Sequence, residues 1–228
     1  MSEPKLAINE IFYSIQGEST WSGLPCAFVR LKGCPLRCHY CDTSYAFSEG
    51  LKRSVTSIVE EVSKLDTRLV EITGGEPLIQ PHVHTLMEAL LDKGYEVLIE
   101  TSGERDISLC DKRIHRIVDI KTPASGAADS FLETNYDDLR LNDEVKFVIM
   151  NKDDFDWALE TTKSQQLIGR VRAVHFSPVM EQAGNSDIAG AKALCPELLS
   201  GWVLASGLPI RLQLQVHKYI WPPQARGV

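Results

Sequence analysis

Seven short β-rich segments recur along the chain, and they constrain the fold more than any other feature of the sequence. Several contain three or four consecutive Val, Ile or Leu residues, a pattern typical of strands buried on both faces of a parallel sheet. The segments are CAFVRLKG (26–33), RLVEITGG (68–75), YEVLIETSG (95–103), RIVDIKTP (116–123), EVKFVIM (144–150), VRAVHFSPV (171–179) and RLQLQVHK (211–218).

Helix patterns lie between some of these segments. Apolar residues at helical spacing predict helices over 55–65, with Ser54 or Thr56 as N-cap, and over 83–91. A third helix is expected over 153–165, where acidic residues suit the N-terminus. Alternating strands and helices predict βα units with right-handed crossovers. Because helices are few, we expect an α/β fold, a partial (open) TIM-like barrel of about six mostly parallel strands.

No repeat, low-complexity tract or linker divides the chain, so one domain is expected over residues 1–228. Polar residues follow nearly every predicted strand, and sites in barrels gather at the carboxyl ends of strands. Loops are polar in any protein, but a whole series of such strand ends favours a site. The residues are Arg30, Thr73, Gly74, Gly75, Glu76, Glu100, Thr101, Ser102, Asp119, Lys121, Lys146, His175, Ser177, Gln215 and His217.

The charge of the chain argues against nucleic-acid binding. The formal net charge is −7 and no long basic run occurs, whereas binding to nucleic acid depends on Lys and Arg that neutralise phosphates. The first ten residues do not resemble a signal peptide, and no apolar run reaches the roughly 18 to 20 residues that span a bilayer. We therefore expect a cytoplasmic protein with no membrane or nucleic-acid partner, in which Cys26, Cys110 and Cys195 are reduced and serve as small buried hydrophobes.

Three further cysteines crowd into one short loop, residues 33–43. Three residues separate Cys34 from Cys38 and two separate Cys38 from Cys41, and Gly33 and Pro35 favour a tight turn. Soft thiolates at such intervals suit an iron–sulfur cluster or zinc. A [4Fe–4S] cluster with three protein thiolates keeps one iron open for a small molecule. Zinc would need a fourth ligand, either His39 or a distant residue.

This loop resembles that of the radical S-adenosylmethionine (SAM) superfamily, whose signature is CxxxCxxC with an aromatic residue, here Tyr40, before the last cysteine. The second mark of the superfamily, a GGEP segment, stands at residues 74–77. The resemblance implies that the open iron binds the amino and carboxylate groups of SAM. Reduction then splits the sulfonium to methionine and a 5′-deoxyadenosyl radical, and the protein orients the reactants.

Further segments are similar to those of one family, the 7-carboxy-7-deazaguanine synthases. They are NEIFYSIQGES (9–19), AFVRLKG (27–33), Asp42-Thr43, ITGGEP (72–77), IETSG (99–103), DIKTP (119–123) and QLQVHKYIW (213–221), which together cover essentially the whole chain. The resemblance implies a radical SAM lyase that converts 6-carboxy-5,6,7,8-tetrahydropterin to 7-carboxy-7-deazaguanine with loss of ammonia, in queuosine and 7-deazapurine biosynthesis. It also implies three cofactors, a [4Fe–4S] cluster, SAM and Mg²⁺.

The family resemblance assigns roles to individual residues. A pterin presents N–H donors that the carboxylate of Glu18 can accept, and the guanidinium of Arg30 offers a fixed fork for the substrate carboxylate. The predicted substrate-binding residues are Ile15, Gln16, Gly17, Glu18, Arg30, Thr73, Gln215 and His217. The predicted SAM-binding residues are Tyr40, Asp42, Gly74, Gly75, Glu76, Ser102, Lys121 and Ser177, and the predicted cluster ligands are Cys34, Cys38 and Cys41.

Thr43 is the predicted Mg²⁺ ligand, and one hydroxyl is a poor site for a hard cation. We therefore expect Mg²⁺ and substrate to bind cooperatively. Simpler roles stay open for three residues: an N-cap for Thr43, a solvated charge for Lys121 and a core histidine for His217.

The resemblance further implies a homodimer and an electron donor such as flavodoxin or ferredoxin. Two other functions remain open at this stage. One is an activase that makes glycyl radicals in a partner protein, and the other is a zinc-stabilised binding module without catalysis.

Overall fold

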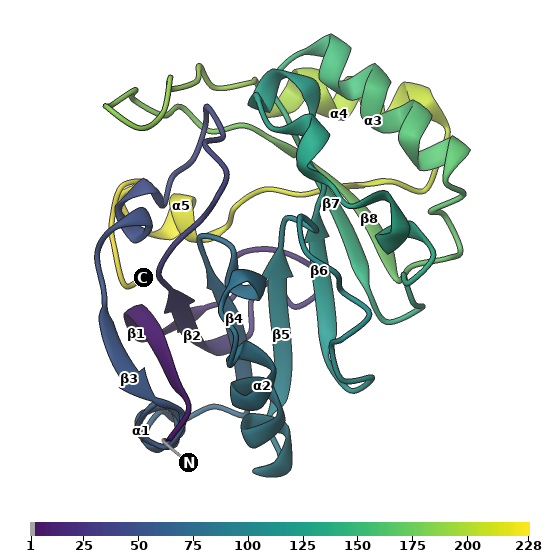
Figure 1. Cartoon of the computed structure of the whole chain (residues 1–228). Coiled ribbons are helices and arrows are strands. Elements are labelled where there is room, and N and C mark those ends of the chain that lie inside the picture. Colours follow the sequence, from purple (N-terminus) through teal and green to yellow (C-terminus); the bar gives the residue numbers. More distant parts are fainter. Residues whose placement is uncertain (1–2) are drawn as a thin grey trace.

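The computed structural model describes residues 3–228 and contains one sheet of nine strands (Figure 1). In chain order the strands are β1 (Lys5–Ile15), β2 (Pro25–Leu31), β3 (Leu51–Ser54), β4 (Leu69–Gly74), β5 (Glu96–Thr101), β6 (His115–Asp119), β7 (Glu144–Ile149), β8 (Ala173–Pro178) and β9 (Arg211–Leu212). Their spatial order is β3-β1-β2-β4-β5-β6-β7-β8-β9. Strand β2 and strands β4 to β9 pair in parallel, whereas β1 pairs antiparallel with β2 and β3. Strands β3 and β9 form the two edges, so the barrel is open, as predicted.

Few helices accompany this sheet. The α-helices of the described residues are α1 (Val55–Val62), α2 (Val83–Asp92), α3 (Lys152–Ser164), α4 (Pro196–Ser206) and α5 (His217–Ile220). Short 3₁₀ turns occur at Ser44–Phe47, Pro77–Ile79, Pro123–Ser125, Ala128–Ser130 and Glu133–Tyr136. The predicted first three helices are confirmed, and the Ser54 hydroxyl caps α1 by accepting a hydrogen bond from the Ser57 N–H at 3.2 Å. Helix α3 begins slightly earlier than predicted, because the Asn151 side chain caps it.

Six of the seven predicted strands agree with the structure to within a few residues. The prediction for 211–218 is wrong, because only Arg211–Leu212 pairs with β8 and the chain then leaves the sheet. Gln215 therefore lies in a loop and His217 at the start of α5, not on a strand. Strands β1 and β3 and helices α4 and α5 were not predicted. Cys26 and Cys110 are buried as predicted, but the prediction is wrong for Cys195, which is exposed just before α4.

Alternation along the strands separates the core from the polar interior of the barrel. In β4, Val70 and Ile72 belong to the outer hydrophobic cluster, while Glu71 and Thr73 line a pocket on the opposite face. Strand β7 repeats the arrangement, with Lys146 on the pocket side. Successive side chains of a strand point to opposite faces, so a buried parallel strand can supply both core and site.

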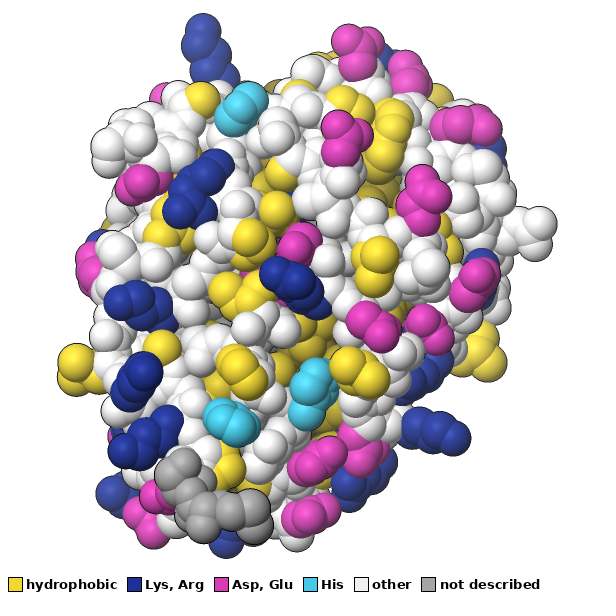
Figure 2. Space-filling model, in the orientation of Figure 1, with side chains coloured by type: hydrophobic (Ala, Val, Ile, Leu, Met, Phe, Trp, Pro, Cys, Tyr) yellow, Lys and Arg dark blue, Asp and Glu magenta, His cyan; other side chains and the backbone are white. Residues whose placement is uncertain are grey.

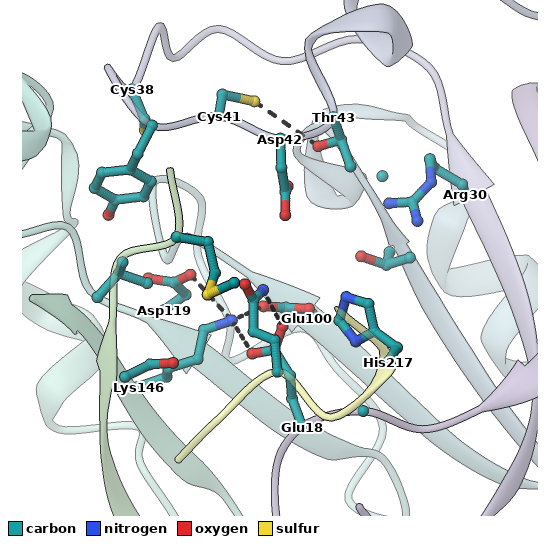
Figure 3. A pocket seen from close by; sticks show the side chains of 18 of the residues that line it. Glu18, Arg30, Cys38, Cys41, Asp42, Thr43, Glu100, Asp119, Lys146 and His217 are labelled. Atoms are coloured by element: carbon teal, nitrogen blue, oxygen red, sulfur yellow. Dashed lines mark hydrogen bonds and ion pairs between the residues drawn. The ribbon is translucent and has the colours of Figure 1, made fainter. Parts of the chain in front are cut away.

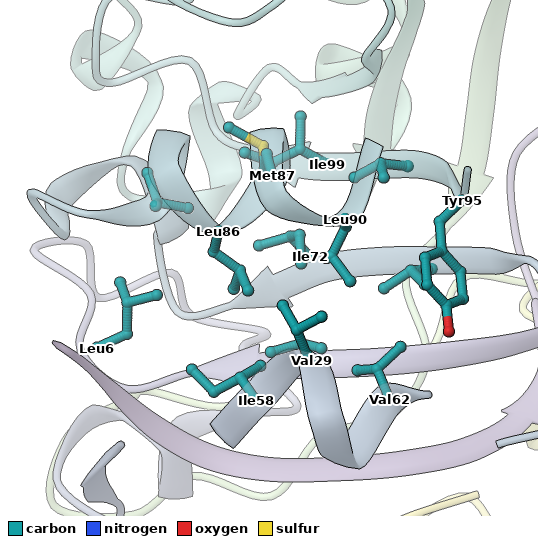
Figure 4. Close-up of a cluster of buried hydrophobic side chains, with 14 of the residues drawn as sticks. Leu6, Val29, Ile58, Val62, Ile72, Leu86, Met87, Leu90, Tyr95 and Ile99 are labelled. Atoms are coloured by element: carbon teal, nitrogen blue, oxygen red, sulfur yellow. The ribbon is translucent and has the colours of Figure 1, made fainter. Parts of the chain in front are cut away.

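Helices α1 and α2 cover the outer face of the first half of the sheet (Figure 4). Leu86 and Leu90 of α2 face Ile72 of β4, and Ile58 of α1 faces Val29 of β2. All five of these side chains are fully buried. Helices α3 and α4 form a second hydrophobic cluster against β7 and β8. The two clusters hold the outside of the barrel, which leaves its interior for polar groups.

Charged side chains of both signs are interspersed over the face of the molecule seen in Figure 2, with apolar side chains between them. None of the helices formed by residues 3–228 combines the length and the apolar character needed to traverse a bilayer.

Candidate active site

The carboxyl ends of the parallel strands open into a pocket of about 210 Å³ (Figure 3). All of the predicted site residues except Glu76 line it: Ile15, Gln16, Gly17, Glu18, Arg30, Cys34, Cys38, Tyr40, Cys41, Asp42, Thr43, Thr73, Gly74, Gly75, Ser102, Lys121, Ser177, Gln215 and His217. The pocket gathers residues from both ends of the chain and from seven strands, β1, β2 and β4 to β8. Glu100, Asp119 and Lys146, expected only as strand-end polar residues without an assigned role, also line it, as do Glu71 and Lys218, which were not predicted.

The three loop cysteines are free thiols on the wall of this pocket. Burial raises the pKa of each thiol, that of Cys34 to about 11. Within residues 3–228, no three His, Cys, Asp or Glu side chains lie close enough together to hold one metal ion. A single zinc ion needs its ligands around one point, whereas a [4Fe–4S] cluster takes each thiolate at a different iron. The three free thiols on one wall of the pocket are the ligand set that a cluster with one open iron takes.

His39 does not complete a zinc site. Its Nδ1 lies 3.0 Å from the carbonyl oxygen of Ala124, and the residue does not line the pocket. The backbone N–H of His39 donates to Ser125 O at 2.9 Å. His39 therefore fastens the cysteine loop to the turn that follows β6.

The GGEP turn packs directly on the cysteine loop. A Cβ at Gly75 would lie 2.2 Å from Gly33 O, so only glycine permits this approach. The Glu76 carboxylate points away from the pocket and accepts hydrogen bonds at 2.7 Å from the Thr101 hydroxyl and from the N–H and hydroxyl of Ser102. Glu76 thus holds the turn against the end of β5 and does not line the pocket.

Lys146 is the hub of a buried ionic network on the floor of the pocket (Figure 3). Its Nζ lies 2.8 Å from Glu18 Oε2 and 3.3 Å from Asp119 Oδ2, and it also pairs with Glu100. The Lys146 side chain is only 4% exposed. Burial alone would raise the pKa of Glu18, but the Lys146 ammonium and the Gln215 amide outweigh it and lower that pKa to about 2. Glu18 is therefore an ionised acceptor at neutral pH.

A second carboxyl group beside this network, that of Glu71, resists ionisation. Burial, together with the charges of Glu100 and Glu18, raises the pKa of Glu71 well above its usual value. The Gln16 side chain donates from Nε2 to Glu71 and accepts the Glu18 N–H at Oε1, at 3.1 Å. Both ends of the Gln16 amide are thus engaged by the protein, which orders the loop that carries Glu18.

Arg30 faces the pocket from β2 (Figure 3). Its Nε donates to Glu10 Oε1 at 2.8 Å, and the Tyr45 hydroxyl donates to the same oxygen at 2.8 Å. Thr43 stands at the N-cap position of the turn Ser44–Phe47, but its side chain makes no capping hydrogen bond. The simple capping role is therefore absent, and the hydroxyl lies 3.8 Å from Cys41 Sγ.

The polar groups on the opposite wall are largely buried. Lys121 is 14% exposed and its Nζ lies 2.9 Å from Asp119 Oδ2, so it is not a solvated surface charge. The Ser177 hydroxyl donates to Gln213 O at 3.0 Å. Among the described residues, the Tyr40 hydroxyl and Asp119 Oδ1 are buried without a hydrogen-bond partner. Unpaired buried polar atoms beside a pocket are suited to a ligand.

The carboxyl-terminal segment closes over the pocket from the side of the cysteine loop. Lys218 Nζ lies 2.5 Å from Asp42 Oδ2, and Val228 lines the pocket. A Cβ at Gly17 would lie 2.0 Å from His217 Nδ1, so glycine is needed for this contact. His217 is thereby held between the pocket and the loop that carries Glu18.

Comparison with known proteins agrees with this geometry. Residues 28–180 match the Radical SAM superfamily. The 7-carboxy-7-deazaguanine synthase of Koribacter versatilis is 46% identical over 98% of this chain and 100% of that protein. This chain belongs to the 7-carboxy-7-deazaguanine synthase family. The family member of Chlorobaculum tepidum is 43% identical over 100% of this chain and 99% of that protein.

Solved structures show the same architecture. The crystal structure of QueE from Escherichia coli has a TM-score of 0.73 at 24% identity and covers 93% of this chain and 95% of that one. Streptococcus suis SuiB bound to S-adenosylmethionine has a TM-score of 0.57 and covers 80% of this chain and 48% of that one. These likenesses confirm the partial barrel.

Membership in the synthase family makes the chain a radical SAM enzyme that acts on a small molecule. It implies a [4Fe–4S] cluster, SAM and Mg²⁺ as cofactors, in agreement with the three thiols and the unpaired polar atoms of the pocket. Neither the activase nor the zinc-stabilised module is favoured by these comparisons.

Proposed function

We propose that this enzyme converts 6-carboxy-5,6,7,8-tetrahydropterin to 7-carboxy-7-deazaguanine with loss of ammonia, a step of queuosine and 7-deazapurine biosynthesis. One observation carries the proposal. An ionised acceptor, Glu18, and a guanidinium, Arg30, line the same pocket as the three cluster thiols. A carboxylated pterin presents the two groups that this pair complements, an edge of N–H donors and a carboxylate.

The chain's own residues account for substrate orientation. Glu18 accepts N–H groups of the pterin, and the fork of Arg30 binds the carboxylate, while Glu10 fixes the guanidinium from behind. Burial lowers the pKa of His217, although Glu18 opposes the shift, so its imidazole is neutral and can both donate and accept a hydrogen bond. Ile15, Gln16, Gly17, Thr73 and Gln215 complete the wall around the ring.

The cofactor side of the pocket is formed by the cysteine loop and the GGEP turn. Cys34, Cys38 and Cys41 would hold the [4Fe–4S] cluster, which when bound supplies the electron that converts SAM to a carbon-centred radical. SAM would be bound by residues that surround the thiols: Tyr40, Asp42, Gly74, Gly75, Ser102, Lys121 and Ser177. Glu76 acts through the turn that it anchors. Ser102 and Ser177 on this wall are buried, whereas Asp42 and the glycines of the turn stay partly exposed.

Mg²⁺ would bind at Thr43 with oxygens of the substrate. The Thr43 hydroxyl is one neutral ligand, and Mg²⁺ keeps an octahedral shell of oxygen ligands. Substrate oxygens would therefore complete the shell, and each ligand should strengthen binding of the other.

The remaining expectations are proposals of the same kind. Residues 1–228 would act as one radical SAM domain with the cluster loop at 33–43, as a homodimer in the cytoplasm. A small electron-transfer protein such as flavodoxin or ferredoxin would reduce the cluster.

The decisive experiment is anaerobic reconstitution of the protein with iron and sulfide, followed by product analysis. The reconstituted protein should be brown, with iron–sulfur absorbance at about 400 nm, and a Cys38→Ser variant should lose that absorbance. After reduction, SAM and 6-carboxytetrahydropterin should give 7-carboxy-7-deazaguanine and ammonia, with a higher rate in Mg²⁺. An absorbing, reduced protein that forms no deazaguanine would refute the proposed function.

A further inference from the structure

Glu18 lies in a loop whose backbone is strained at the next residue. Ser19 has φ 61, in the left-handed region that residues with a side chain rarely adopt. The loop joins β1 to β2, and Gln16 closes it through backbone hydrogen bonds to Leu24 and Gly23, both at 2.8 Å. The strained residue directly follows Glu18, the proposed substrate acceptor. Other contacts must therefore hold the Ser19 backbone in this conformation.

Gln213 supplies two such contacts with one amide. Its Oε1 accepts the Ser19 N–H at 2.7 Å, and its Nε2 donates to Glu18 Oε2 at 3.0 Å. The orientation of the amide is unambiguous, because a carbonyl oxygen must face the N–H and an NH₂ group must face the carboxylate. A single side chain thus fixes both the strained backbone and the carboxylate beside it.

The other side of Ser19 is held independently. Thr20 donates from its N–H at 2.9 Å and from its hydroxyl at 2.5 Å to the two carboxylate oxygens of Glu144. His175 Nε2 lies 2.6 Å from Glu144 Oε2, and both side chains are at most 3% exposed. The loop therefore keeps one anchor when the Gln213 contacts are removed.

Gln213 is itself anchored on the sheet. Its N–H donates to Phe176 O at 3.0 Å, and its carbonyl oxygen accepts the Ser177 hydroxyl at 3.0 Å. The residue is 7% exposed and is not among the residues that line the pocket. The Gln213 side chain therefore reaches the pocket through its partner Glu18, whereas its backbone carbonyl holds Ser177 and is not altered by a side-chain substitution.

We propose that Gln213 is a positioning residue, which sets the Glu18 carboxylate in the orientation that receives the pterin by clamping it together with the left-handed backbone of Ser19. This inference rests on the proposed function. A loop ordered in advance loses little conformational entropy when the substrate binds, so the clamp acts on substrate affinity and not on SAM.

The test compares reconstituted wild-type enzyme with Gln213→Leu, which removes both hydrogen bonds at similar volume. The KM for 6-carboxytetrahydropterin should rise by about tenfold or more, as for loss of a hydrogen bond to a charged group. The kcat should stay within about twofold and the Kd for SAM should not change, because the hydrogen bonds lie on the substrate side. Gln165→Leu, the same chemical change at the end of α3, should leave all three values unaltered.

Two further variants separate positioning from folding. Gln213→Glu keeps an acceptor for the Ser19 N–H but places a second carboxyl beside Glu18, so it should raise the KM further than Gln213→Leu while cluster content is retained. Ser19→Gly relieves the backbone strain, and in the Gln213→Leu background it should not restore the KM, because the Glu18 contact is still missing.

Three results would overturn the inference: an unchanged KM in Gln213→Leu, an equal loss of SAM affinity, or full rescue by Ser19→Gly. If Gln213→Leu does not fold, Gln213→Glu decides alone, and a wild-type KM would then overturn the inference. A wild-type enzyme that forms no product from the pterin would instead refute the proposed function, which keeps the two failures distinct.

Discussion

Removal of the Lys146 ammonium should destabilise the fold more than any surface change, and the loss should depend on pH. The variant Lys146→Met leaves Glu18 and Glu100 without their cation, while Asp119 keeps its ion pair with Lys121 at 2.9 Å. Breaking one buried ion pair by removing a single partner costs about 3–5 kcal/mol. Because Lys146 serves more than one carboxylate, the upper part of that range is expected at pH 8.

Acid should reverse part of this loss. In the wild type the pKa of Glu18 is depressed to about 2 from its ordinary 4.5, so its contribution to stability is present above the ordinary value and lost below. In the variant, burial remains and the ammonium is gone, so the folded-state pKa of Glu18 should rise from its depressed value, and that of Glu100, which already lies above 4.5, should rise further. Protonation in the folded state then restores stability as the pH falls through these raised values, and the deficit should shrink between about pH 8 and pH 5.

Urea unfolding of the anaerobic, reconstituted proteins, followed by circular dichroism at several pH values, measures both effects. Lys152→Met is the matched control, since Lys152 forms an exposed pair with Asp156 and should change stability by no more than about 0.5 kcal/mol. A loss below about 1 kcal/mol for Lys146→Met at pH 8, or a loss that is the same at pH 5, contradicts the network as described.

Three other changes test the pocket directly. Gly75→Ala would place a Cβ 2.2 Å from Gly33 O and 2.6 Å from Cys34 Cβ, so cluster absorbance after reconstitution should be lost; Gly201→Ala, which meets nothing within 4 Å, should retain it. Arg30→Lys replaces the planar guanidinium with a point charge, so the KM for the carboxylated substrate should rise by about tenfold in steady-state assays. An unchanged KM would contradict the role of Arg30 in substrate binding. Titration calorimetry should show that Mg²⁺ binds more tightly when substrate is present, and equal affinities would exclude a shared coordination shell.

The sequence predicted the parallel strands well because they are buried on both faces and read as apolar runs. It missed β1, although Leu6 and Ile8 are buried at alternate positions, since an antiparallel strand with one open face gives a weaker signal than a Val- and Ile-rich run. The error at 211–218 is of the opposite kind, because a strand was predicted there that does not form. Its alternating glutamines resemble a strand, but Gln213 and Gln215 turn toward Glu18 and their spacing serves that carboxylate.

Site residues that belong to sequence motifs were predictable, whereas those that reach the pocket only through the packing of the sheet were not. The spacing of the cysteines and glycines identified them. Lys146 was noticed only as a polar residue at a strand end, and Glu71 was overlooked. A charged residue inside an apolar strand, as in VKFVI and LVEIT, is the signal that could have found both, because an unpaired charge is rarely buried. Which charges meet which depends on the curvature of the sheet, and no local pattern in the sequence encodes it.

The distance along the chain between Glu18 and its glutamine partners has a consequence for biogenesis. Gln213 and Gln215 lie 195 and 197 residues downstream of Glu18, so closing this ring carries nearly the largest entropic penalty that a chain of this length can impose. Synthesis delivers the amino-terminal part first, so a nascent chain can order its early strands long before the acidic loop meets its anchors. The substrate-binding loop is therefore completed last. A polypeptide released prematurely would be partly folded but unable to bind the pterin.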